Sequence, residues 1–287
     1  MAEGDIGSRI RGSISGLVKE TGDVLTGTVK TVKDTVTDTL RGTGDVAKEA
    51  TGAVAGAITG ALQAVGDVGG SLIDVVKGTV TGALEAVGQI TEVTQNVIST
   101  AMRAAIKTTQ DIGGDLTEAV AGSAQAAVSA TQNVAVDVEQ SAFALGRGAI
   151  AGAKDISGDV TSLARDTVKG VIKGARDINA DMVTSAIEST ASGLVKGAGE
   201  VGMDIAAAAR GAVIGAVQTA REIGTSAEDA ATAAMTGAFT GAQAFGQTAI
   251  DAVRGIIGSD VEGITVAAPD EPAKKPAASR KKPAPKK

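Results

Sequence analysis

The 287-residue sequence contains no cysteine, histidine, tryptophan or tyrosine. The missing cysteine excludes disulfides, thiolate metal sites and cysteine nucleophiles, and the missing histidine removes the commonest general base and metal ligand. The three aromatic residues are Phe143, Phe239 and Phe245, so a core must be built from valine, isoleucine, leucine and alanine. We therefore expect a non-enzymatic protein without a cofactor, and we assign no catalytic, cofactor-binding or metal-binding residue.

Proline is absent before residue 269, which permits long uninterrupted helices. All five prolines lie in the final segment APDEPAKKPAASRKKPAPKK, which has a net charge of +5, against -11 for the residues before it. A segment of this composition cannot bury enough apolar surface to fold. The sequence therefore predicts a polar lead over residues 1–9, a repeat region over 10–263 and a disordered basic tail over 264–287.

Two features bear on a membrane location. The N-terminal stretch MAEGDIGSRIRG has no apolar segment of the kind found in secretory signals. Two long uncharged stretches, residues 119–136 and 230–250, are rich in small and polar residues rather than in the large apolar residues of a membrane span. We expect a cytoplasmic protein without a signal peptide or transmembrane helix, located at the surface of an inclusion or membrane.

A short phrase returns every 22 residues, as TGDV at 21–24 and 43–46 and as VGDV at 65–68. Such self-similarity indicates a repeat architecture. Alignment on the phrase gives a mostly acidic column, in which every member is followed by valine or isoleucine. The acidic column consists of Asp23, Asp45, Asp67, Gln89, Asp111, Asn133, Asp155, Asp177, Glu200 and Glu222.

Apolar residues recur 1, 9 and 17 positions after the acidic column. The period is two units of eleven residues, and eleven residues close three helical turns. At this pitch the apolar positions form an arc about 130° wide, with the acidic column nearly opposite as a solvated face. The candidate surface-binding residues on this arc are Val24, Val32, Leu40, Val46, Val54, Leu62, Val68, Val76, Leu84, Ile90, Ile98, Ile106, Ile112, Val120, Val128, Val134, Ile150, Ile156, Ile172, Ile178 and Leu194.

Glycine is abundant, with 39 residues, and each glycine inside a helix costs about 0.5–1 kcal/mol relative to alanine. We therefore expect an isolated helix of this sequence to be weak in water until a surface covers its apolar arc. Many glycines lie four residues apart, as do Gly78 and Gly82 or Gly211 and Gly215. This spacing is compatible with drift in a small-residue composition and with close approach of two helices.

The predicted fold class is all-α. Long amphipathic helices built from the 22-residue repeats are either extended or folded back as helical hairpins, and the disordered tail follows them. A β-solenoid is an alternative, because segments such as TVKTVKDTVTDTL are rich in β-branched residues, but strict alternation is absent.

The segments GAVAGAITGALQAVGDVGGSL (52–72) and VKGTVTGALEAVGQITE (76–92) resemble the 11-residue amphipathic repeats of synucleins and perilipins. The resemblance implies a chain that is disordered in water and forms long helices on phospholipid or lipid-droplet surfaces. Synuclein repeats carry many lysines that suit anionic lipid. The acidic repeat region of this chain is better suited to a neutral surface.

The tail segment PAKKPAASRKKPAPKK is similar to the Lys/Ala/Pro tails of linker histones and of some granule-coating phasins. The resemblance implies a helical part that holds a storage inclusion and a tail that touches DNA. The tail charge would give weak, salt-dependent contact with phosphates, or would dock on the acidic repeat region. The basic residues concerned are Lys274, Lys275, Arg280, Lys281, Lys282, Lys286 and Lys287.

These observations favour an amphipathic coat or structural protein on a hydrophobic inclusion, such as a lipid droplet or polyester granule, or on a membrane. Its expected partners are the lipid or polymer surface, further copies of the chain and, weakly, nucleic acid. One alternative is a late-embryogenesis-abundant-like protectant against desiccation and stress, although that family is usually richer in lysine and glutamate. A further alternative is a self-associating helical bundle or filament.

Overall fold

The computed structural model describes residues 2–19, 24–42 and 46–266, which are all-α apart from one small β-hairpin. The helices are α1 (Ala2–Lys19), α2 (Val24–Arg41), α3 (Val46–Val68), α4 (Leu72–Ile90), α5 (Gln95–Asp111), α6 (Leu116–Ala130), α7 (Val138–Asp155), α8 (Val160–Ile178), α9 (Val183–Val201), α10 (Ile205–Ile223), α11 (Ala227–Ala242) and α12 (Gln247–Arg254). The remaining elements are the 3-10 turns η1 (Ala180–Met182) and η2 (Gln243–Phe245) and the strands β1 (Asp260–Val261) and β2 (Ile264–Thr265).

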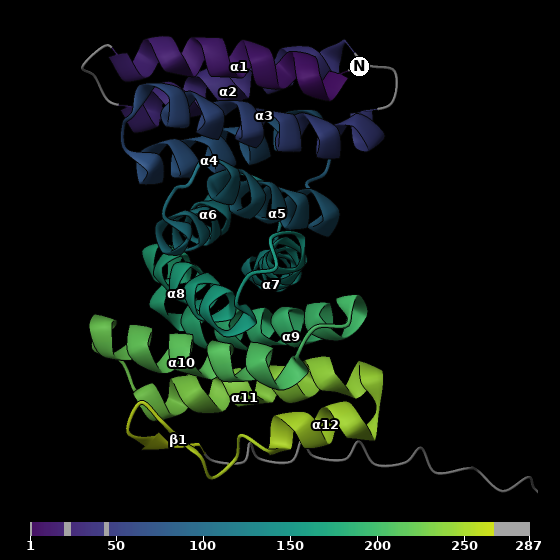
Figure 1. The fold of residues 1–287 in the computed structure, drawn as a ribbon, viewed down its shortest axis with the longest axis vertical. Helices are drawn as coiled ribbons and strands as arrows, with labels where there is room; N and C mark the ends of the chain where they lie inside the picture. Colours follow the sequence, from purple (N-terminus) through teal and green to yellow (C-terminus); the bar gives the residue numbers. More distant parts are fainter. Residues whose placement is uncertain (1, 20–23, 43–45, 267–287) are drawn as a thin grey trace, which may run out of the picture.

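The helices form a two-layered stack (Figure 1). Consecutive helices are joined by short turns and reverse direction, and each helix packs mainly against the helix two places along the chain. The odd-numbered helices from α1 to α11 therefore form one layer, and the even-numbered helices from α2 to α10 form the other. Figure 1 shows α1 near one end of the stack and α11, α12 and the hairpin near the other. The predicted helical repeat is confirmed in its folded-back form.

One 22-residue unit contains one helix and one turn. Glu200 and Glu222, members of the acidic column, are the penultimate residues of α9 and α10. Two positions later, Gly202 and Gly224 are left-handed, with φ of 72° and 75°, a conformation that glycine adopts without steric cost. Asp204 follows Gly202 by two positions, and its side chain accepts a hydrogen bond from the backbone N–H of Ala207 in the first turn of α10. The side chains that cap α-helices in this way are Ser71, Thr94, Asp115, Asp159, Asp204 and Ser226.

The core lies between the two layers and contains the apolar columns of the repeat. The candidate residues 9 and 17 positions after the acidic column are buried, and those directly after it are half-buried at the edge of the core. Ile98, Ile150 and Ile172, for example, are at most 1% exposed. The amphipathic period thus supplies the layer-to-layer contact within one chain.

The structure differs from the predicted boundaries at both ends of the repeat region. The polar lead expected over residues 1–9 is wrong, because α1 begins at Ala2 and Ile6 is buried in the core. The boundary expected near residue 264 falls inside the β-hairpin, in which Asp260 pairs with Thr265. Val266, which follows the hairpin, is buried. The remainder of the predicted tail lies outside the described residues.

Candidate functional site

Small residues hold each layer together. Gly82 in α4 lies against Val29 in α2, and Gly215 in α10 lies against Arg165 in α8. A β-carbon added to either glycine would lie 2.5 Å from the carbonyl oxygen opposite, so the two backbones would have to separate. We call this arrangement the stacking contact: positions 11 and 15 after the acidic column face the backbone of the helix two places earlier. The spacing of four between glycines therefore reflects close helix–helix approach.

The acidic column supports the stacking contact with polar bonds. Arg103 in α5 donates two hydrogen bonds to Asp155 in α7, from Nε to Oδ2 at 2.5 Å and from Nη2 to Oδ1 at 2.8 Å. Arg147 and Glu200 repeat this arrangement between α7 and α9, with Nη2 and Oε2 2.6 Å apart. Further pairs of this kind are Arg11–Asp67, Gln125–Asp177, Lys169–Glu222 and Lys173–Glu222. The acidic column is thus more than a solvated face, because it links the ends of α3, α7, α8, α9 and α10 to the helix two places earlier.

Two carboxyl groups near the turn between α7 and α8 have lowered pKa values. The hydrogen bond from Arg103 holds the pKa of Asp155 below its ordinary value. The backbone N–H of Ser162, 2.6 Å from Oδ1 of Asp159, lowers the pKa of that carboxyl. Both carboxylates therefore contribute stability above the ordinary aspartate pKa, and this contribution is lost as the pH falls through the lowered value.

On α1 the repeat positions of the stacking contact have no partner helix among the described residues. We define the α1 face as Arg9, Gly12, Ser13 and Gly16. All four are exposed, and nothing lies within 4 Å of a β-carbon added to Gly12 or Gly16. The equivalent residues of α10 are all buried, and they are Ala208, Gly211, Ala212 and Gly215. The α1 face is therefore an unpartnered copy of the contact that builds the stack.

The neighbouring helix α2 differs at the same repeat positions. Asp34 and Asp38 stand where α1 has Gly12 and Gly16, and both aspartates are exposed. A carboxylate at these positions has a large desolvation cost against the carbonyl oxygens of another helix unless a cation pairs with it, as Arg165 pairs with the buried Asp166 at the equivalent position of α8. Of the two helices at this end of the stack, α1 is the one that retains the small residues of the stacking contact.

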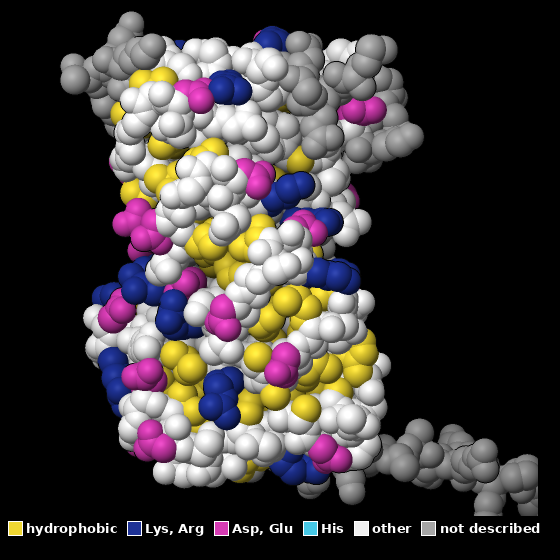
Figure 2. All heavy atoms as spheres, in the orientation of Figure 1, with side chains coloured by type: hydrophobic (Ala, Val, Ile, Leu, Met, Phe, Trp, Pro, Cys, Tyr) yellow, Lys and Arg dark blue, Asp and Glu magenta, His cyan; other side chains and the backbone are white. Residues whose placement is uncertain are grey.

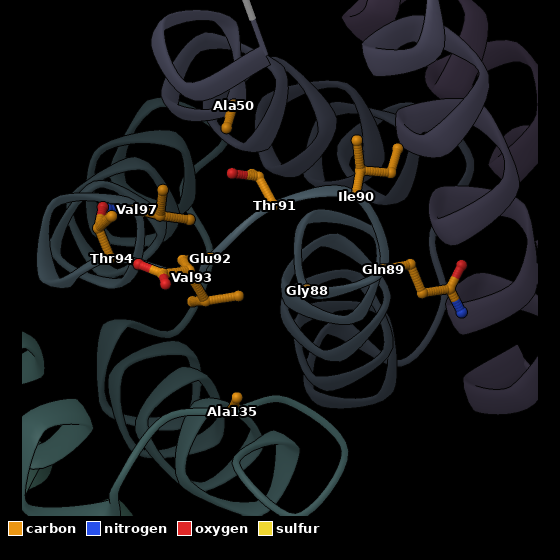
Figure 3. Close-up of a pocket in the computed structure, with 10 residues that line it drawn as sticks. All are labelled: Ala50, Gly88, Gln89, Ile90, Thr91, Glu92, Val93, Thr94, Val97 and Ala135. Atoms are coloured by element: carbon orange, nitrogen blue, oxygen red, sulfur yellow. The ribbon is translucent and has the colours of Figure 1, made fainter.

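A hollow of about 640 Å³ lies where α4 passes into α5 (Figure 3). Its lining includes Ala50 of α3, the connection over residues 91–94 and Ala135. This connection is one residue longer than the one over 69–71, and Thr91 is extended where the turns after α3, α9 and α10 have a left-handed glycine. Glu92 is the one charged residue of the lining, so the hollow offers no pair of titratable groups.

The predicted surface-binding residues do not form a surface of the folded stack. Neighbouring helices cover them, and the large apolar side chains exposed among the described residues are Leu25, Met182 and Phe245, at 37–38%. Figure 2 shows charged side chains of both signs distributed over one face of the molecule. Alternate helices shelter the arc in the closed stack, and contact of these residues with an external surface stays a prediction. The seven basic residues of the predicted tail contact lie outside the described residues.

Within the described ranges, no helix has the length and apolar character needed to cross a membrane. The same part of the chain contains no group of three or more acidic residues placed to hold a metal ion.

No known family model matches the chain, and no curated protein matches it. Among solved structures, the chain is similar to a de novo designed helical repeat protein, with 19% identity and a TM-score of 0.36. That similarity covers 61% of this chain and 97% of the designed protein.

Proposed function

We propose that the protein is a non-enzymatic structural protein that self-associates through its helical stack. The observation that carries this proposal is the α1 face, which presents the stacking contact without a partner among the described residues. Glycine at Gly12 and Gly16 costs about 0.5–1 kcal/mol of helix stability at each position. Such residues are expected where another backbone has to approach closely.

The repeat architecture supports the same conclusion. Each helix contacts mainly its near neighbours, so the stack is quasi-one-dimensional and can be extended by adding a further unit at an open end. A second copy that stacks on α1 would repeat a contact that the chain already makes many times. Self-association therefore requires no new type of interface.

Sedimentation velocity over a range of protein concentrations tests this proposal. The chain has a mass of 28.0 kDa, and self-association predicts species larger than this whose share grows with concentration. A 28.0 kDa species at every concentration, with the helices intact, would rule the proposal out.

A coat on a hydrophobic inclusion remains a second candidate, provided that the two layers separate on the surface. One observation favours such opening: several buried hydroxyl groups have no hydrogen-bond partner, and each unpaired buried hydroxyl costs about 1–3 kcal/mol. Opening would return these hydroxyls to water and present the apolar columns to the inclusion. The hydroxyls belong to Thr28, Thr37, Thr109, Ser123, Ser141 and Thr219.

A further inference from the structure

The odd-numbered layer carries a complementary face at its other end, on α11. We define the α11 face as Glu228, Thr232, Thr236 and Thr240, which lie 6, 10, 14 and 18 positions after the acidic column. In α8, the first two of these repeat positions are Thr161 and Arg165, whose carbonyl oxygens face Gly211 and Gly215. The α11 face is therefore the side of a helix that normally receives the next helix of its layer.

The threonines of the α11 face can be covered without leaving an unpaired donor. The hydroxyls of Thr232, Thr236 and Thr240 each donate to the backbone carbonyl four residues earlier, at 3.0, 2.9 and 2.9 Å. Because these donors are already satisfied within α11, covering the face with another helix does not incur the cost of a buried unbonded hydroxyl.

The C-terminal elements leave the α11 face accessible. The hairpin is held on the even-numbered layer, where Gln218 of α10 donates to Glu262 at 2.9 Å. α12 packs against both α10 and α11, yet Glu228, Thr232 and Thr240 stay exposed. The C-terminal elements therefore contact both layers at this end. They leave Thr236 half-buried and the other three residues of the α11 face open.

Charges on the two faces are complementary. In the internal contact of α10 with α8, repeat position 11 faces position 6. The same register between two copies places Gly12 of one copy opposite Glu228 of the other. Arg9 precedes Gly12 by almost one turn. In this register Arg9 of one copy lies near the first turn of α11 of the other copy, where Glu228 and Asp229 are both exposed. An arginine beside two carboxylates favours this pairing and its orientation.

We infer that the α1 face of one copy docks on the α11 face of a second copy, in the register of the internal stacking contact. This inference rests on the proposed self-association and specifies its geometry. The two faces differ, so the contact is heterologous: it builds an open series unless the rotation between successive copies closes a ring. The exposed carboxylates of Asp34 and Asp38 disfavour the same contact on α2.

The first test transfers the acids of α2 to α1 by the double substitution Gly12→Asp and Gly16→Asp. The residues replaced face open space, and α2 carries aspartate at the same repeat positions, so the variant is expected to fold. Circular dichroism and thermal melting check this. We expect self-association, measured by sedimentation velocity, to weaken by at least about tenfold. Association as strong as in the unaltered protein would overturn the inference.

A charge exchange tests the identity of the partner face. Arg9→Glu alone, and Glu228→Arg with Asp229→Arg alone, should each weaken association because like charges then meet at the junction. An equimolar mixture of the two variants should restore it, since every junction between unlike chains has opposite charges. Normal association of the Glu228→Arg, Asp229→Arg variant would overturn the head-to-tail geometry and would indicate that α1 pairs with another surface, such as a second α1.

The remaining outcomes separate this inference from the function on which it rests. If deletion of residues 267–287 abolishes association while the α1 and α11 substitutions have no effect, the basic tail is the occupant and the head-to-tail contact is overturned. In that case self-association still stands. If the unaltered chain is monomeric at all concentrations, the proposed function fails, and the inference fails with it.

Discussion

Val29 in α2 and Gly82 in α4 are so close that a β-carbon added to Gly82 would lie 2.5 Å from the carbonyl oxygen of Val29. The same relationship recurs along the stack, as between Arg165 and Gly215. Layers built from close backbone contacts need small residues at fixed positions, which explains the glycines at the stacking contact.

Replacing Gly82 with alanine is expected to destabilise the protein. The added methyl group would force α4 away from α2, and overpacking of this kind costs about 1–3 kcal/mol. The control is Gly52→Ala in α3, where no neighbour lies within 4 Å of the new β-carbon and a gain of about 0.5–1 kcal/mol is expected. Denaturant unfolding of both variants measures the difference, and equal effects would contradict the stacking contact.

Replacing Ile172 with alanine should destabilise the chain in plain buffer. Ile172 is completely buried in α8, and deletion of a buried isoleucine side chain costs about 2–5 kcal/mol. Leu25→Ala is the matched control, because Leu25 is 38% exposed and a change below about 1 kcal/mol is expected there. If both substitutions leave the unfolding midpoint unchanged, Ile172 is not part of a core in buffer.

Asp159 at the N-terminus of α8 should give a pH-dependent contribution to stability. Asp159→Ala removes the cap and is expected to cost about 1 kcal/mol at neutral pH. The pKa of Asp159 is lowered in the folded state, so this cost should shrink as the pH falls through that lowered value. Asp159→Asn keeps a capping oxygen without a titrating carboxyl and should lack this acid dependence. Unfolding curves from neutral to acidic pH compare the three proteins, and a cost for alanine that persists in acid would contradict the assignment.

Thr219→Val distinguishes a coat that opens from a stack that stays closed. The substitution removes an unpaired buried hydroxyl and should stabilise the closed stack by about 1 kcal/mol. If the coat requires opening, flotation with a neutral lipid emulsion should show slower binding by this variant although its interior is more apolar. Thr248→Val, at an exposed position of α12, should bind as the unaltered protein does. Faster binding by Thr219→Val would count against opening.

The sequence predicted the helices and their buried columns because a period of 22 residues is visible in residues such as Val76, Ile98 and Val120. It did not predict the turns, although the signal was present. Gly202 and Asp204 follow Glu200 at the positions of a left-handed C-terminal residue and an N-cap, and equivalents recur in other repeats. Without the turns, the sequence left open whether an external surface or a neighbouring helix covers the arc.

The α1 face could not be recognised from local sequence. Gly12 and Gly16 have the same spacing as Gly211 and Gly215. The two pairs differ only in the fold, because α8 covers Gly211 and Gly215 while no described helix covers Gly12 and Gly16. The hairpin at residues 260–265 was also missed, since its two strands contain only two residues each and carry no detectable period.

Hydrogen–deuterium exchange of the isolated protein in dilute buffer, without lipid, tests the central claim most directly. A stack that shelters its own apolar columns predicts slow exchange of the backbone amides in α3 to α10, with the strongest protection around buried residues such as Ile150 and Ile172. Rapid exchange throughout these helices in buffer, with protection appearing only after a neutral lipid emulsion is added, would contradict it.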